Sequence, residues 1–199
     1  MKIYHAPRSR SLRVIWAAEE LDIPYETVEA SFMKPDAAFL AANPAATLPA
    51  MVDGEVVMTE SVAIIQYLAD KHGPSPLAVA PGDPRYPDYL QFLLFGEASL
   101  AAPLNAILGT KFMGPADQKD NFTVQIISRS YQRRLGLVER ALESRDYMAG
   151  DDFTLADISV GYALGLADML EMGEPPELIQ AYSQRLTSRP AYQRALQVG

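Results

Sequence analysis

Two serines stand where helices are expected to begin, and these are the places where the chain could hold an anion. Ser9 follows a short apolar strand and precedes a helical pattern, and Ser61 opens a second helical pattern. A serine in this place can be an ordinary N-cap. The same hydroxyl, beside the free amides of the first turn, also favours a bound carboxylate or another anion. Both serines are therefore candidate site residues, with plain capping as the alternative.

The composition excludes several kinds of chemistry. The 199 residues include no cysteine, which removes disulfides, thiolate metal ligands and a cysteine nucleophile. His5 and His72 are the only histidines, so we expect no histidine-rich metal site. The net charge of −8 argues against nucleic acid or an anionic membrane as the main partner. Because no long apolar signal or membrane segment is apparent, we expect a soluble, cytoplasmic protein.

The order of patterns predicts two domains. Strands at 2–5 and 25–28 flank a helix over 9–21, and a hairpin with Asp53-Gly54 as its turn leads to a helix from Ser61. This βαβ-ββα order predicts an α+β, thioredoxin-like domain over residues 1–76. Prolines and glycines at 77–85 predict a linker. Residues 86–199 carry only helical patterns and predict an all-α helical bundle, whose first helix is bent near Pro103.

A second local motif lies in the helical half. Thr154 can cap a helix that runs to about Leu170, and Asp157 can reach back to the Thr154 amide. Phe153 and Ile158 have the spacing of a hydrophobic staple. These features predict a helix start fixed by a capping box.

Together these motifs resemble the glutathione transferase family, in particular its serine-type, theta- and phi-like bacterial members. The resemblance rests on Leu48-Pro49-Ala50, on the hairpin, on Glu60-Ser61 and on the Thr154 block, in that order. It implies a cis Pro49 that exposes a strand edge. It also implies a homodimer joined through the first two long helices of the second domain, with Tyr86, Tyr89, Leu93 and Phe95 as candidate contacts.

The resemblance implies that Ser9 is catalytic and donates a hydrogen bond to the glutathione sulfur. A free thiol has a pKa of about 8.5, so only a few per cent is thiolate at neutral pH. Lowering that pKa by two units takes about 2.7 kcal/mol, and a hydrogen bond to a charged group supplies about 1.5–3 kcal/mol. Ser11, Arg10 and Tyr4 remain alternatives for the same role.

Glutathione is expected as a co-substrate, with no tightly bound cofactor. The resemblance implies that the Leu48 backbone pairs with the cysteinyl part of the tripeptide, and that Glu60 and Ser61 hold the γ-glutamyl end. The expected glutathione-binding residues are Leu48, Pro49, Glu60, Ser61, Lys34 and Arg10. Ala46-Thr47 stand where many relatives have Gly-Lys or Gly-Gln, so the resemblance does not carry over a side-chain contact from this position to the glycyl carboxylate.

A hydrophobic electrophile is the expected second substrate, bound between the domains. The candidate residues are His5, Arg8, Leu108, Lys111 and Phe112, with Arg10, Leu104 and Met113 as further candidates. The expected reaction is attack of the glutathione thiolate on an electrophilic carbon. Two alternatives stay open: another glutathione-dependent reaction, such as ether cleavage, dehalogenation or peroxide reduction, and a binding protein of the same fold without catalysis.

Overall fold

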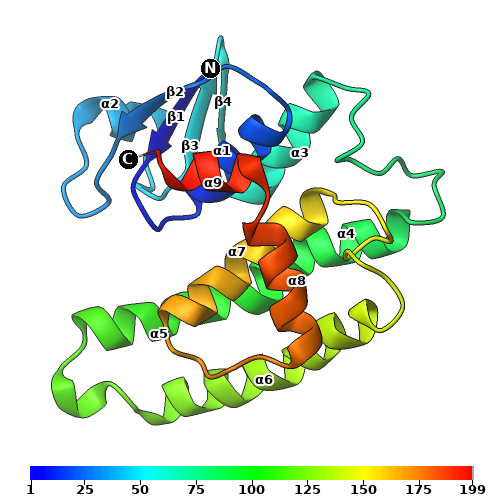
Figure 1. Cartoon of the computed structure of the whole chain (residues 1–199). Helices are drawn as coiled ribbons and strands as arrows, with labels where there is room; N and C mark the ends of the chain where they lie inside the picture. The colour runs from blue at the N-terminus through cyan, green and yellow to red at the C-terminus, as the bar shows by residue number, and fades with distance from the viewer. Residues whose placement is uncertain (199) are drawn as a thin grey trace. The chain divides into compact units, whose positions relative to one another are not determined.

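The computed structural model describes residues 1–198, and the packing divides the chain into two units (Figure 1). Residues 1–78 and 187–199 form the first unit, and residues 79–186 form the second. The last segment is therefore grouped with the first unit, although its place in the chain had suggested the helical domain.

A four-stranded mixed sheet forms the centre of the first unit. Its order is β2-β1-β3-β4, with β1 parallel to β2 and antiparallel to β3. The strands are β1 (Lys2–His5), β2 (Glu26–Glu29), β3 (Ala50–Asp53) and β4 (Val56–Thr59). The helices are α1 (Ser11–Glu20), α2 (Ala37–Ala42), α3 (Ser61–Lys71) and α9 (Pro190–Leu196). This confirms the expected thioredoxin-like arrangement.

Side-chain alternation along β1 assigns the helices to the two faces of the sheet. Successive residues of a strand point to opposite faces. Tyr4 stacks on Phe39 of α2, with ring centroids 5.4 Å apart. His5 points to the other face, where its ring meets Ser11 at the start of α1. Helices α3 and α9 pack against α1, so they belong to that second face (Figure 1).

The C-terminal helix α9 is joined to α1 by ion pairs and an aromatic contact. Arg189 binds Glu20 with an Nε–Oε1 distance of 2.6 Å, and Arg194 binds Glu19 at 2.6 Å. Trp16 packs edge-on against Tyr192, with ring centroids 4.7 Å apart. These contacts explain why this segment belongs to the first unit.

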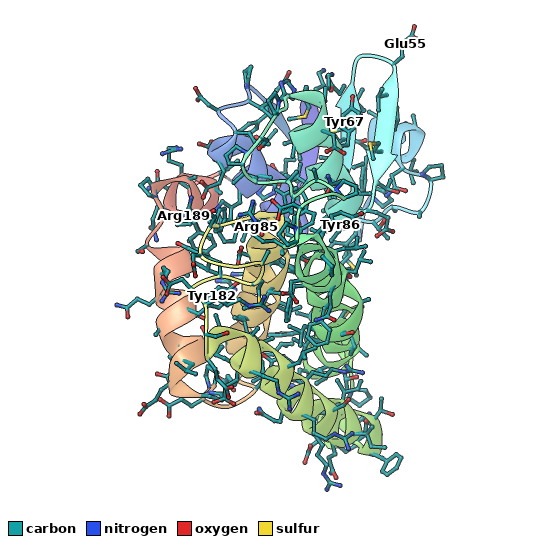
Figure 2. All side chains as sticks on the ribbon, turned by 90° about the vertical axis from the view of Figure 1, so that its right-hand side faces the viewer. Glu55, Tyr67, Arg85, Tyr86, Tyr182 and Arg189 are labelled. Atoms are coloured by element: carbon teal, nitrogen blue, oxygen red, sulfur yellow. The ribbon has the colours of Figure 1, made fainter. Side chains whose placement is uncertain are left out.

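The hairpin turn lies one residue later than the sequence predicted. Asp53 is still paired with Val56, so the two-residue loop is Gly54-Glu55 and not Asp53-Gly54. Gly54 has a φ of 65° at the first loop position, which glycine adopts without steric cost. Figure 2 shows Glu55 at the tip of this hairpin, pointing away from the sheet.

The second unit is helical throughout its regular structure. Its elements are α4 (Tyr86–Phe95), the π-helical η1 (Gly96–Ala101), α5 (Ala102–Met113), the short 3-10 helix η2 (Ala116–Gln118), α6 (Phe122–Leu142), α7 (Leu155–Met169) and α8 (Glu177–Thr187). Helix α8 ends at Thr187, which is the first residue of the segment grouped with the first unit. The predicted all-helical organisation is confirmed.

A π-helical segment in the first long helix packs tightly against α7. An added Cβ at Gly96 would lie 2.5 Å from Ser159, so only glycine fits there. The Ser159 hydroxyl donates to the Leu93 carbonyl at 2.7 Å. A side chain that bonds into a helix ladder and a π-bulge are both recognised causes of helix bending. The bend expected near Pro103 stays a prediction; the structure has a π-helical segment that ends at Ala101, just before Pro103.

Helix α7 begins as the sequence predicted. Asp157 accepts a hydrogen bond from the Thr154 amide at 2.8 Å, with Thr154 as the N-cap residue. Its carboxylate also accepts from the Met148 amide and from the Tyr182 hydroxyl, each at 2.8 Å. Burial raises the pKa of Asp157, and the donors oppose that rise.

The continuous helical run Tyr86–Met113 is long and apolar enough to meet a test for a membrane span based on length and composition. The sequence pattern had indicated no membrane segment. Core helices of soluble proteins pass the same test, and α4 and η1 pack closely against α7.

Candidate functional site

The segments predicted to bind glutathione lie at one end of the sheet. The antiparallel pairing places Tyr4, near the end of β1, opposite Ala50, the first residue of β3. Ala50 is in turn opposite Thr59, the last residue of β4. The loop before α1, the Leu48-Pro49 step and the start of α3 therefore leave the sheet at the same end.

A buried arginine joins the first turns of α1 and α3. Arg13 of α1 is fully buried, and its Nη1 donates to Ser61 Oγ at 3.2 Å. Ser61 is the first residue of α3 and is only 2% exposed. Two positive helix ends and a guanidinium thus lie close together, which favours an anionic group at this position.

Glu60 precedes α3 in a strained backbone conformation. Its φ is 69° and its ψ is 99°, outside the regions that L-residues usually adopt. The side chain is exposed, and the Glu60 carbonyl accepts the first intrahelical bond from the Ile64 amide at 2.9 Å. Strain of this kind concentrates at functional sites, where the surrounding structure holds it.

The Leu48-Pro49 step lies just beyond the last strand pair of β3. The peptide bond between the two residues is cis, and Pro49 is buried. Asn43 is 3% exposed and donates from Nδ2 to the Thr47 carbonyl at 2.7 Å. It thereby fixes the loop that leads into Leu48.

Ser9 belongs to a chain of three hydrogen-bonded side chains. Its Oγ lies 2.5 Å from Ser11 Oγ, and Ser11 Oγ lies 2.7 Å from His5 Nδ1. The other ring nitrogen of His5 lies 2.9 Å from the Val198 carbonyl oxygen. Ser11 is fully buried, whereas Ser9 is partly exposed. Burial lowers the pKa of His5 below its ordinary value, and the bond to Val198 opposes this.

Three further predicted residues have different surroundings. The Tyr4 hydroxyl donates to the Ala38 carbonyl at 3.4 Å, on the face of the sheet away from α1, which disfavours it as the thiolate donor. Lys34 is exposed in the loop before α2, where its amide donates to Ser31 Oγ at 3.2 Å. Arg10 is the partly exposed N-cap residue of α1, next to Ser9.

The residues predicted for the second substrate fall into two groups. In the first unit Arg8 is exposed with a φ of 61°, but His5 is only 5% exposed, which leaves little of its ring available to a substrate. In the second unit Phe112 is 68% exposed. Lys111 donates to the Leu170 carbonyl at the end of α7, which gives it a role within that unit.

The other α5 candidates also differ in exposure. Leu104 is fully buried in the core of the second unit, whereas Leu108 is partly exposed and Met113 is 68% exposed. Leu104 therefore serves packing and is not available to a substrate.

Two other features of the described residues bear on alternative sites. Within residues 1–198 there is no group of three or more histidine, cysteine, aspartate or glutamate side chains that could hold a metal ion. A surface hollow of the first unit is lined by Glu19, Tyr25 and Val198 among others, and none of the predicted glutathione-binding residues lines it.

Sequence reasoning missed two residues that shape the site. Arg13 lies between Leu12 and Val14 on an otherwise apolar helix face, and a charge in that place is a signal for a buried ion or hydrogen bond. Asn43 precedes Pro44, in a position that is typical of an ordinary turn. Nothing local distinguishes it from a surface residue.

Comparisons with known proteins agree with this arrangement. The family model for the N-terminal domain of glutathione S-transferases matches residues 3–76, and the model for the C-terminal domain matches residues 102–190. Glutathione S-transferase GstB of Escherichia coli is 26% identical over 192 residues, which are 94% of this chain and 92% of that protein. Glutathione S-transferase D7 of Drosophila melanogaster is 30% identical over 159 residues, covering 78% of this chain and 68% of that protein.

The solved structures give the same result. A ternary complex of BphK, a bacterial glutathione transferase, has a TM-score of 0.88 and 29% identity, and the match covers 99% of this chain and 98% of that one. The strand order, the two helix starts and these matches over both halves lead to one conclusion: the chain belongs to the glutathione S-transferase family.

Proposed function

We propose that this chain is an enzyme, a glutathione transferase that activates the glutathione thiol for attack on an electrophilic carbon. The observation that carries the proposal is the meeting of three backbone features at one end of the sheet. These are the Leu48-Pro49 step, the start of α3 with Ser61 and Arg13, and the loop with Ser9. A sphingomonad glutathione S-transferase that is 28% identical, with a TM-score of 0.83, was solved with glutathione bound.

Each feature has a role in the proposed complex. The Leu48 backbone pairs with the cysteinyl residue of glutathione as an added strand would. Ser61 and the α3 amides hold the γ-glutamyl carboxylate, with the Arg13 charge behind them. Glu60 pairs with the ammonium of the same residue, Lys34 reaches the glycyl carboxylate, and the Ser9 hydroxyl meets the sulfur.

Catalysis in this proposal depends on the thiolate. The sulfur attacks the carbon of the second substrate, a carbon–sulfur bond forms, and the leaving group departs with its electron pair. Arg8 and Arg10 lie closest in sequence to Ser9, so a polar or anionic electrophile would be tolerated beside it. The exposed Phe112 and the partly exposed Leu108 supply an apolar surface on α5.

Calorimetric titration with glutathione tests the proposal. We expect saturable binding, with S-methylglutathione also binding because it keeps both carboxylates and the backbone. Turnover is then measured with a panel of halogenated aromatics, aryl ethers and hydroperoxides. Absence of binding at millimolar glutathione would refute the proposal, and binding without turnover of any halogenated aromatic would refute the transferase reaction.

We also propose a homodimer in the cytoplasm. Leu90 and Leu94 of α4 are 39% and 53% exposed, so α4 offers an apolar strip for a second copy. Tyr89 and Leu93, which the sequence suggested for this contact, are buried inside their own unit. Light scattering should give twice the chain mass, and Leu94→Glu should shift the protein to monomer. Cell fractionation tests the location.

A further inference from the structure

The hydrogen bonds around His5 fix the direction in which its chain of hydroxyls can pass a proton. The Val198 carbonyl oxygen can only accept, so the His5 nitrogen 2.9 Å away, Nε2, must carry a proton. In a neutral imidazole the other nitrogen, Nδ1, then has a lone pair and accepts from Ser11 Oγ at 2.7 Å. The burial of His5 favours this neutral form.

The same rule determines what Ser9 does. A hydroxyl has one proton, and that of Ser11 is used toward His5. At the 2.5 Å contact between the two serines, Ser9 must therefore donate to Ser11 Oγ. In this state the outer side of Ser9 Oγ offers only a lone pair. It can accept a proton from a thiol, but it cannot donate to a thiolate.

Rotation of single hydroxyls does not allow Ser9 to donate to a thiolate while His5 is neutral. If Ser9 turned its proton outward, Ser11 would have to donate to Ser9, and its oxygen would face the Nδ1 lone pair of His5 at 2.7 Å. Only a proton on Nδ1 makes the outward arrangement consistent along the whole chain. A thiolate at Ser9 and an imidazolium at His5 therefore require each other.

From this geometry we propose that His5 is a positioning residue that takes up the glutathione proton through Ser11 and Ser9, and this rests on the proposed function above. The S–H bond breaks and its electron pair stays on sulfur. The proton goes to Ser9 Oγ, the Ser9 proton goes to Ser11 Oγ, and the Ser11 proton goes to His5 Nδ1. Ser9 then donates to the thiolate, and the imidazolium keeps its bond to the Val198 carbonyl.

Within residues 1–198 the hydrogen-bond partners of His5 are a hydroxyl and a backbone carbonyl, both uncharged, so a negative sulfur at the far end of the chain would add a new charge. Strand β2 places Glu29 in register with His5, but Glu29 is exposed. Helix α1 contributes Ser11, and the C-terminal segment contributes the Val198 carbonyl. A negative charge at the far end of the chain favours the imidazolium form.

Nitrogen NMR of the histidine rings tests the relay in the intact protein. The chain has two histidines, His5 and the exposed His72, so His72→Gln assigns the signals and serves as the matched control. At neutral pH without ligand we expect a neutral His5 with its proton on Nε2. With glutathione we expect both His5 nitrogens to be protonated. With S-methylglutathione, which has no thiol proton, we expect His5 to stay neutral.

The outcomes separate this proposal from the proposed function. If glutathione binds and its thiolate absorbance appears while His5 stays neutral, the relay is wrong and the transferase proposal stands. If glutathione does not bind at all, both fail. Ser11→Ala gives a second reading: the His5 response to glutathione should vanish, and the thiolate fraction at neutral pH should fall about tenfold. A merely structural Ser11 would lower stability and leave the His5 response in place.

Discussion

Helices α1 and α7 each begin beside a cluster of hydrogen-bonded polar groups, but the two clusters serve different purposes. At α7 the hydrogen-bonding capacity of the Asp157 carboxylate is used by the Thr154 amide and hydroxyl, the Met148 amide and the Tyr182 hydroxyl, all inside the core. At α1 the chain of His5 and Ser11 ends at Ser9, which is partly exposed. A polar cluster that is closed on itself stabilises the fold, and one that ends at the surface can act on a ligand.

The largest effect should come from removing the Asp157 carboxylate, which accepts the hydrogen bonds of the buried cluster at the start of α7. Asp157→Ala leaves several buried donors without an acceptor, so we expect a loss of about 3 kcal/mol or more in the free energy of unfolding. Urea denaturation measures it. Asp157→Asn keeps one carbonyl acceptor and should lose less, and Tyr182→Phe, which removes one donor, should lose about 1 kcal/mol. A loss below about 1 kcal/mol for the alanine variant would contradict this view of α7.

Changes in the His5, Ser11 and Ser9 cluster at the start of α1 should alter the pKa of bound glutathione and leave the free energy of unfolding nearly unchanged. Ser9→Ala removes the hydroxyl proposed to face the sulfur, so the pKa of bound glutathione should rise by an amount equivalent to about 1.5–3 kcal/mol. The free energy of unfolding should change by about 0.5 kcal/mol or less, as for a surface substitution. Thiolate absorbance of the complex against pH gives the first quantity. An unmoved thiol pKa would assign the role to another group.

Replacing Ser61 should affect both stability and glutathione binding, because Ser61 is buried and is also proposed to bind the ligand. Ser61→Ala removes the oxygen that accepts from Arg13 and the donor for the γ-glutamyl carboxylate. We expect glutathione affinity to fall about tenfold, which corresponds to about 1.4 kcal/mol. Calorimetry measures the change, with Ser61→Thr as the control that keeps a hydroxyl. Equal affinities for the alanine and wild-type proteins would leave Ser61 as a structural residue.

The smallest effect should be a contribution of His5 to acid sensitivity. Burial lowers the pKa of His5 in the folded state, so the unfolded chain binds this proton first as the pH falls. The contribution is complete above the ordinary histidine pKa of about 6.5 and is lost as the pH falls toward the lower folded value. Denaturation at several pH values should show a shallower decline for His5→Gln than for wild type. The exposed His72 provides the control, since His72→Gln should leave the decline unchanged.

Local motifs made much of the fold predictable. The helix starts at Thr154 and Ser61 and the turn at Gly54 each depend on residues close together in sequence, and the structure has all three. The turn was wrong by one residue, because its exact position depends on which residues the two strands pair and not on the Asp-Gly signal alone.

The sequence by itself determined the order of strands and helices and the Thr154 cap of α7, since these follow from periodicity and short-range hydrogen bonds. The resemblance of its motifs to a known family indicated the family. The serines were wrong as cap residues of α1 and α3, whose N-cap residues are Arg10 and Glu60. Only the tertiary structure decided that Arg13 meets Ser61, 48 residues away, and that His5 meets Val198, 193 residues away. It also decided that α9 packs on α1. Such contacts depend on how the helices pack against the sheet, and no local pattern specifies which distant residues that packing brings together.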